Sequence, residues 1–282
     1  MTSASRSIDQ IAVLPTLRTR YSYRQLDLED WSWRYIAAGR GVRSLLLLPG
    51  AFIGAEMWMH LIPALQDGYR VIAPDLPSKA LTAAELNAAI IRLLKAEGIH
   101  KIVVLGYSAG GGLAQAFAQA RPDRVEHLIL SHCTALSADA AHRLDRMAGV
   151  LKLLPHALIR SLFHRRNSRY PSDSEWAECT RAFFAERIAT LQKSDFITFL
   201  QAGANLARTF HFDPGALQGW QGKTLLLSSK DDATTFPRWE KLQARYPENT
   251  QTHLFERGGH HTILLFPDTY NQTIIRFLES IR

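Results

Sequence analysis

The sequence predicts an α/β fold, in which a mainly parallel sheet carries helices on both of its faces. Three observations support this prediction. Short apolar runs of strand length alternate with amphipathic helical patterns through most of the 282-residue chain. The links between these runs are short, as in strand–helix–strand units with parallel strands. One long helical stretch interrupts the alternation before strands resume near the carboxyl end.

Composition is that of an ordinary globular protein, with 46% hydrophobic and 21% charged residues. The net charge of +7 comes without a long block of Lys or Arg, so we interpret it as a solvated surface and expect no nucleic-acid partner. No segment reaches the roughly twenty apolar residues of a membrane span, so integral membrane association is not expected. The two cysteines, Cys133 and Cys179, lack metal-binding spacing. We therefore expect a cytoplasmic protein without a metal site.

The first elements are assigned from hydrophobic periodicity. Trp31 to Ala38 alternates apolar and polar residues and predicts an antiparallel edge strand. Ser44 to Pro49 contains four consecutive leucines, which predicts a strand covered on both faces. Ala55 to Leu65 has helical spacing, and Tyr69 to Pro74 predicts the next strand.

The segment from Thr82 to Glu97 predicts an amphipathic helix with one apolar stripe. Thr82 is expected to cap its first turn, with Glu85 three residues later as the partner in a capping box. The elements expected next are a strand at Lys101–Leu105, a helix at Gly110–Ala120 and a strand at Val125–Ser131.

From about residue 135 to residue 214 the patterns are helical and no strand is expected. The elements expected after that block are a strand at Thr224–Leu227, a helix at Pro237–Tyr246, a strand at Thr252–Phe255 and a helix at Pro267–Ile281. A helical block between two strands of one sheet indicates an insertion. We therefore divide the chain into an amino-terminal extension (1–20), a core (21–134 and 215–282) and the inserted block (135–214).

The segment Gly106-Tyr107-Ser108-Ala109-Gly110 follows the apolar run Ile102–Leu105 and precedes a helix. A serine in this pattern lies on a sharp strand-to-helix turn, which strains its backbone and exposes its hydroxyl at the edge of the sheet. The flanking glycines allow neighbouring backbone to pass close by. The sequence therefore predicts Ser108 as a nucleophile.

A serine nucleophile needs a base, and the base needs an acid that orients it. His260 lies between a strand and the last helix in a Gly-Gly-His-His segment, and we select it over its neighbour His261. Asp232 follows the strand of three leucines, and we select it as the acid, whereas Asp231 is interpreted as loop surface. The chain order Ser, Asp, His is the one expected of a nucleophile-elbow hydrolase.

Two backbone amides are expected to stabilise the oxyanion. One belongs to Ala109, directly after the nucleophile. The other belongs to Ala51, in the Pro49-Gly50-Ala51-Phe52 loop that follows the leucine strand. Phe52 and Tyr107 lie beside these motifs and are expected to bind substrate.

With these motifs, the chain resembles the α/β-hydrolase superfamily from about Trp31 to its end, in the manner of the capped serine esterases. The resemblance implies an eight-stranded, mainly parallel sheet with a helical cap inserted after the sixth strand, here 135–214. Two departures stand out: Pro49 replaces a common histidine, and the loop after Asp75-Leu76-Pro77 is short. Both are similar to maspardin-like members, in which the fold is associated with protein binding.

We expect a serine hydrolase that cleaves a small carboxylic ester or thioester with an apolar group through an acyl-enzyme, with no cofactor. The same residues would also serve a carbon–carbon bond hydrolase, a lactonase or a perhydrolase. Other interpretations are a catalytically silent binding protein and a lipase of membrane surfaces. The apolar residues of the cap are expected to pack it and line the pocket. Its basic cluster is interpreted as a solvated helix end or as a site for an anionic substrate: Arg160, His164, Arg165, Arg166 and Arg169.

Overall fold

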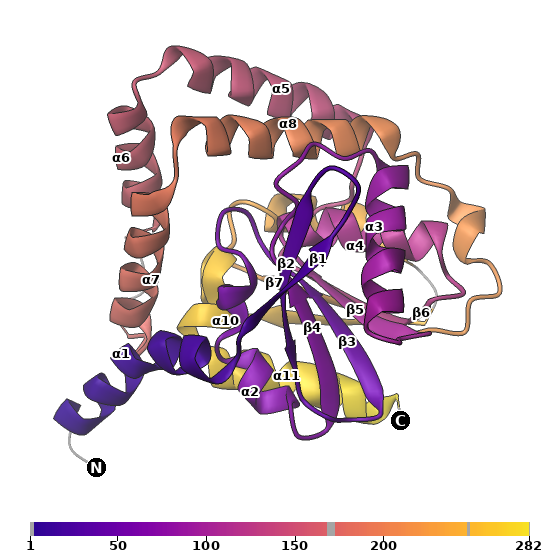
Figure 1. Cartoon of the computed structure of the whole chain (residues 1–282), viewed down its shortest axis with the longest axis horizontal. Coiled ribbons are helices and arrows are strands. Elements are labelled where there is room, and N and C mark those ends of the chain that lie inside the picture. Colours follow the sequence, from indigo (N-terminus) through magenta and orange to yellow (C-terminus); the bar gives the residue numbers. More distant parts are fainter. Residues whose placement is uncertain (1–2, 168–172, 247–248, 282) are drawn as a thin grey trace.

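A computed structural model describes residues 3–167, 173–246 and 249–281 of the chain. Its centre is an eight-stranded sheet in the order β1-β2-β4-β3-β5-β6-β7-β8 (Figure 1). Six neighbouring strands, from β4 to β8, are parallel, whereas β2 pairs antiparallel with β4 and β1 antiparallel with β2. The strands are β1 (Tyr23–Asp27), β2 (Ser32–Ala38), β3 (Arg43–Leu48), β4 (Tyr69–Pro74), β5 (Ile102–Tyr107), β6 (Val125–Ser131), β7 (Thr224–Ser229) and β8 (Thr250–Phe255). The predicted eight-stranded, mainly parallel sheet is confirmed.

The leucine run of β3 is fully buried, as a strand covered on both faces must be. Because side chains alternate across a strand, Leu45 and Leu47 pack into the core on one face of the sheet. Leu46 and Leu48 pack into the core on the other face. Each buried leucine contributes about 1.5–3 kcal/mol relative to an exposed one, so this run fixes the central position of β3.

Helices cover both faces of the sheet. Residues of α1 (Ser3–Arg20), α2 (Leu61–Leu65) and α11 (Pro267–Ser280) belong to one core. Residues of α3 (Ala83–Ala96), α4 (Ala109–Ala120) and α9 (Trp239–Gln243) belong to the other. The remaining short helices are η1 (Ala55–Trp58), η2 (Pro214–Leu217), η3 (Phe236–Arg238), η4 (Gly259–His261) and α10 (Thr262–Leu265). Among the described residues, no helix combines the length and apolar character that crossing a bilayer requires.

In the described residues, four α-helices and then the short η2 lie between β6 and β7. The α-helices are α5 (Ala138–Leu153), α6 (His156–Asn167), α7 (Ala177–Thr190) and α8 (Lys193–Thr209). In Figure 1, α5 and α8 run side by side above the sheet, and α6 and α7 descend along one side of it. The described part of this segment contains no strand, in line with its helical sequence pattern.

Three sequence predictions need correction. The strand predicted at Trp31–Ala38 is not at the edge of the sheet, because β1 pairs along its outer side. The strand β1 was not predicted because it is short and half exposed, so its sequence has no hydrophobic pattern. The helix expected over Ala55–Leu65 is divided into η1 and α2, since Pro63 is tolerated only in the first turn of a helix. The expected helix at Pro237–Tyr246 is likewise divided, into η3 and the shorter α9.

The predicted extension, residues 1–20, is largely the helix α1, and its second half packs onto the core. Leu14 and Leu17 are buried there. Arg18 forms ion pairs of 2.7 Å with Glu56 of η1 and 2.6 Å with Glu186 of α7. This part of the segment is therefore held by the domain rather than projecting from it.

The capping box of α3 is confirmed. The Glu85 amide donates to the Thr82 hydroxyl oxygen at 3.2 Å, and the Glu85 carboxylate accepts from the Thr82 amide at 2.8 Å. Two amides that the helix itself leaves without acceptors are thereby satisfied.

We expect Thr82→Ala to lower the free energy of unfolding by about 1 kcal/mol, because the cap is lost. Urea titration followed by circular dichroism measures this change. Thr82→Ser retains the hydroxyl and is the matched control. Equal stability of the alanine and serine variants would contradict the assigned role of the cap.

Candidate active site

Ser108 lies at the sharp turn between β5 and α4, with backbone angles of φ 52° and ψ −114°. A positive φ is strained for a residue other than glycine, and such strain is concentrated at functional sites. A Cβ atom at Gly106 would collide with the backbone of Gly110, and one at Gly110 would collide with the carbonyl of Leu48. Both positions therefore require glycine, as the sequence pattern predicts.

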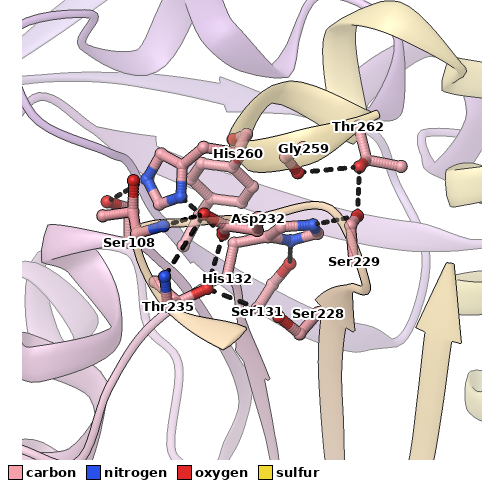
Figure 2. Close-up of polar contacts among 12 residues, drawn as sticks. Ser108, Ser131, His132, Ser228, Ser229, Asp232, Thr235, Gly259, His260 and Thr262 are labelled. Atoms are coloured by element: carbon pink, nitrogen blue, oxygen red, sulfur yellow. Dashed lines mark hydrogen bonds and ion pairs between the residues drawn. The ribbon is translucent and has the colours of Figure 1, made fainter. Parts of the chain in front are cut away.

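The three residues predicted as nucleophile, base and acid lie together (Figure 2). Ser108 Oγ is 2.8 Å from His260 Nε2, and His260 Nδ1 is 2.8 Å from Asp232 Oδ2. Ser108 follows β5, Asp232 follows β7 and His260 lies in η4 after β8. Because these strands are parallel, their carboxyl ends bring the three side chains to one edge of the sheet.

The Asp232 carboxylate is buried and accepts several hydrogen bonds besides that of His260. Its partners include the Thr235 hydroxyl, the Thr235 amide at 3.2 Å and the Thr234 amide at 2.8 Å. Burial alone would raise the pKa of Asp232, but the hydrogen bond and charge of His260, together with the Thr235 hydroxyl, hold that pKa well below its ordinary value of 3.8. Asp232 is therefore an anion at neutral pH.

The neighbours of the base and the acid have different contacts. His261 packs against Phe184, with ring centroids 4.6 Å apart, and it lines the same cavity as Ser108. The interpretation of Asp231 as loop surface is incomplete. Its exposed carboxylate accepts from the amides of Gly258 at 3.1 Å and Gly259 at 2.9 Å, so it holds the turn that carries His260.

Ala51 and Ala109 lie on two loops that are directly joined, since the Gly110 amide donates to the Pro49 carbonyl at 3.0 Å. The Gly50 amide is occupied by Met57 Sδ at 3.0 Å. Within the described ranges, neither the Ala51 amide nor the Ala109 amide donates a hydrogen bond to the protein. Both amides are thus available to a ligand oxygen.

A cavity of about 140 Å³ adjoins Ser108 and His260. Phe52 and Tyr107, the two residues predicted to bind substrate, both line it. The other lining residues are Gly50, Ala51, Ile53, Phe163, Phe184, Arg187, Ile188, Leu191, Thr234 and His261. Most of this wall is apolar, and α6 and α7 supply part of it.

The polar end of Tyr107 is used within the protein. Its hydroxyl donates to the backbone carbonyl of His260, and its ring meets the buried Trp58 edge to face at 6.3 Å. Phe52, by contrast, has φ 67° and packs against Phe163, with ring centroids 5.4 Å apart. Tyr107 therefore contributes its ring to the cavity and its hydroxyl to the turn that carries His260.

The described side chains of the predicted basic cluster do not line the cavity. Arg160, His164 and Arg165 are exposed on α6, while Arg169 and the side chain of Arg166 lie outside the described residues. The cavity is instead lined by Arg187 of α7, which the sequence analysis missed because helical spacing does not distinguish it from other cations. Arg187 Nε lies 3.4 Å from the Phe52 carbonyl oxygen, and this arginine forms no ion pair with any described residue.

Thr235 is a second residue that the sequence analysis missed, although a signal for it exists. An aspartate in a turn commonly accepts from the backbone two residues further on, as Asp232 does from the Thr234 amide, and this brings Thr235 beside the carboxylate. As for metals, no three His, Cys, Asp or Glu side chains in the described part of the chain gather in a way that would hold an ion.

Comparison with known proteins gives consistent matches. A family model described as "Alpha/beta hydrolase family" matches residues 45–273. A 2-hydroxy-6-oxononadienedioate/2-hydroxy-6-oxononatrienedioate hydrolase of Cupriavidus pinatubonensis is 33% identical over 86% of this chain and 89% of its own length. A similarly named hydrolase of Dechloromonas aromatica is 32% identical, but the match spans only 46% of this chain and 48% of that protein. A thermophilic esterase from Thermogutta terrifontis has a similar structure, with a TM-score of 0.71 and 21% identity over 92% of this chain and 99% of its own.

The lowered pKa of Asp232 has a consequence for stability in acid. Since the folded protein binds this proton more weakly than the unfolded chain, the stabilisation is complete above the ordinary pKa near 3.8 and is lost as the pH falls toward the lower, folded value. We expect Asp232→Asn to cost about 1.5–3 kcal/mol at neutral pH, because charge-assisted hydrogen bonds are lost. The difference in unfolding free energy between Asp232→Asn and the wild type should become smaller below the ordinary pKa of Asp232, near 3.8.

Urea unfolding between neutral pH and pH 3 measures this difference. Asp268→Asn, which changes an exposed aspartate at the start of α11, is the control. A deficit that is the same at every pH would contradict the assignment.

Proposed function

Because the chain belongs to the alpha/beta hydrolase family, we propose that it is a serine hydrolase that cleaves a carboxylic ester or thioester through an acyl-enzyme intermediate. One observation carries the proposal. Ser108 Oγ, both ring nitrogens of His260 and the Asp232 carboxylate form a continuous hydrogen-bonded series with two separations of 2.8 Å. This arrangement meets the geometric requirement for a base that removes a serine proton.

In the proposed mechanism, Ser108 Oγ attacks the carbonyl carbon while its proton passes to His260 Nε2. The Ala51 and Ala109 amides donate to the oxyanion that forms. Collapse of the tetrahedral intermediate breaks the bond to the alcohol or thiol, which leaves with the proton from His260. Water then gives a proton to the same nitrogen while its oxygen attacks the acyl-enzyme. Collapse of the second tetrahedral intermediate breaks the bond to Ser108 Oγ, which takes the proton back from His260 as the carboxylic acid leaves. Asp232 orients the imidazole and stabilises its cation.

We assign α5–α8, within residues 135–214, as the cap over the core formed by 21–134 and 215–282. Support comes from the cavity, because Phe163 of α6 and Phe184 and Ile188 of α7 line it together with Ser108. An apolar wall favours an apolar acyl or alcohol group through burial of surface from water. The small cavity volume favours a short chain over a long one.

We expect Ser108→Ala to abolish labelling by a fluorophosphonate probe and to lower kcat/KM for p-nitrophenyl esters by at least about 1,000-fold, since no other group replaces the nucleophile. Esters of two to four carbons should be better substrates than those of eight or more. Ser161→Ala, on an exposed face of α6, should behave as the wild type.

Folded wild-type protein that neither reacts with the probe nor turns over any ester between pH 6 and 9 would support the binding-protein alternative. A rate that rises sharply at a lipid interface would instead favour the lipase of membrane surfaces.

A second candidate, hydrolysis of a carbon–carbon bond in a carboxylate-bearing ketone, is favoured by Arg187. This cation lies on the cavity wall and forms no ion pair with the described residues, so a substrate carboxylate could accept from its guanidinium. Two relatives are named for 2-hydroxy-6-oxo dicarboxylates, which carry such groups. Ser108 would attack the ketone carbonyl to give the same kind of acyl-enzyme, but the carbon–carbon bond would break and the carbon leaving group would take the proton from His260.

If a carboxylate binds there, Arg187→Gln should raise KM for carboxylate-bearing substrates at least about tenfold and leave KM for neutral esters within about twofold, because a charge-assisted contact is worth about 1.5–3 kcal/mol. Steady-state kinetics with matched pairs, such as monomethyl succinate and methyl butyrate, measure the difference. The control is Arg181→Gln on the same helix, where the arginine pairs with Glu178. An equal rise in KM for both substrates would exclude carboxylate recognition by Arg187.

A further inference from the structure

We propose that His132, a buried residue outside the reacting groups, is a positioning residue that holds the turn carrying His260 through a hydrogen-bond chain of fixed direction. The inference rests on the function proposed above only in assigning His260 as the base. His132 directly follows β6, and its ring lies beneath the reacting residues with both nitrogens engaged (Figure 2). Ser131 Oγ is 2.9 Å from Nδ1, and Ser229 Oγ is 2.9 Å from Nε2.

The chain continues from the ring to the turn itself. Ser229 Oγ is 2.6 Å from Thr262 Oγ1, and the Thr262 hydroxyl donates to the Gly259 carbonyl at 3.1 Å. Gly259 is the residue immediately before His260. On the other side of the ring, the Tyr270 hydroxyl donates to Ser131 Oγ at 2.9 Å.

Each bond between the Gly259 carbonyl and the His132 ring has one possible direction, because each hydroxyl carries a single proton. The Gly259 carbonyl only accepts, so Thr262 donates to it and must accept from Ser229. Ser229 has then used its proton and must accept from His132 Nε2–H. At the other end, Ser131 accepts from Tyr270 and donates to His132 Nδ1. These directions require a proton on His132 Nε2, and in a neutral ring Nδ1 is then the acceptor of the Ser131 hydroxyl.

The surroundings keep this histidine neutral. Its side chain is fully buried, and burial together with the positive charge of a protonated His260 lowers the pKa of His132 to about 3, against a smaller opposing effect of Asp232. The other titratable groups that face the ring are Tyr107 of β5 and Tyr270 of α11. His132 is thus unsuited to accept the proton that His260 handles, which leaves it a structural role.

A second contact links the same ring to the same turn. His132 stacks on Tyr107, with ring centroids 5.4 Å apart and planes at 29°, and the Tyr107 hydroxyl donates to the His260 carbonyl. Thr262, which is linked to His132 through Ser229, therefore holds the Gly259 carbonyl. Tyr107, which stacks on His132, holds the His260 carbonyl. The backbone of His132 has φ 46°, a strained value that persists where surrounding contacts over-determine it.

The position of the turn matters because His260 Nε2 must stay within hydrogen-bond reach of Ser108 Oγ. A displacement of about 1 Å at a reacting group can lower the rate about 100-fold. The chain from His132 thus acts on the reaction through His260 alone, without touching substrate.

The test uses Thr262, which lies between His132 and the turn, since changes at His132 itself affect folding as well. We expect Thr262→Val to lower both the rate of fluorophosphonate labelling and kcat by about 10- to 100-fold. KM should stay within about twofold of the wild-type value. The apparent pKa of the rate profile assigned to His260 should shift. Thr262→Ser retains the hydroxyl and should restore the rate and the pH profile to within about threefold. Tyr35→Phe removes a buried hydroxyl that bonds to Glu97, outside this set of hydrogen bonds, and should leave the rate and the pH profile nearly unchanged.

Two kinetic outcomes overturn the inference: equal rates for the Thr262→Val and Thr262→Ser variants, or the same loss in Tyr35→Phe as in Thr262→Val at matched thermal stability. Nitrogen-15 NMR of the imidazoles gives a readout that needs no turnover, and Ser108→Ala protein serves equally well for it. The expected result is a neutral Nε2–H His132 from pH 6 to 8, whereas an Nδ1–H or charged ring overturns the proposal. If the wild-type protein does not react with the probe but the NMR result is as expected, the proposed hydrolase function is refuted. The proposed hydrogen-bond series from His132 to Gly259 is then still supported.

Discussion

Parallel pairing of the central strands is the constraint on which the rest of the structure depends. The buried leucines of β3 fix that strand between β4 and β5, and the same direction is kept through β6, β7 and β8. Strands of one direction end at one edge, so Ser108 and His260 meet although they are 152 residues apart in sequence. The helices, the turn glycines and the buried hydrogen bonds all serve to hold the loops at that edge.

The sequence was sufficient to predict those parts of the molecule that local chemistry determines. Apolar runs and helical periodicity located the parallel strands and the main helices, and the capping box of α3 followed from Thr82 and Glu85. The glycines around Ser108 marked a turn that no other residue tolerates. Asp232 and His260 could be chosen because each follows a strand of the same sheet, and the structure brings both to Ser108.

What the sequence left out depends on contacts between distant segments. The strand β1 is half exposed and has no pattern of its own, so only its pairing with β2 defines it. Arg187 differs from other helical cations only in the direction it faces, which the packing of α7 decides. The same applies to Arg160, His164 and Arg165 of α6, which are exposed. His132 resembles any buried histidine until Ser229 and Thr262 are seen beside it.

Arg18 joins the amino-terminal helix to two other parts of the molecule through Glu56 and Glu186. The residues that follow Glu186 are Arg187 and Ile188, both on the wall of the cavity. The amino-terminal helix is therefore joined by ion pairs to residues next to the wall of the cavity. A truncation that removes Arg18 would leave the buried Glu56 carboxylate without this cation.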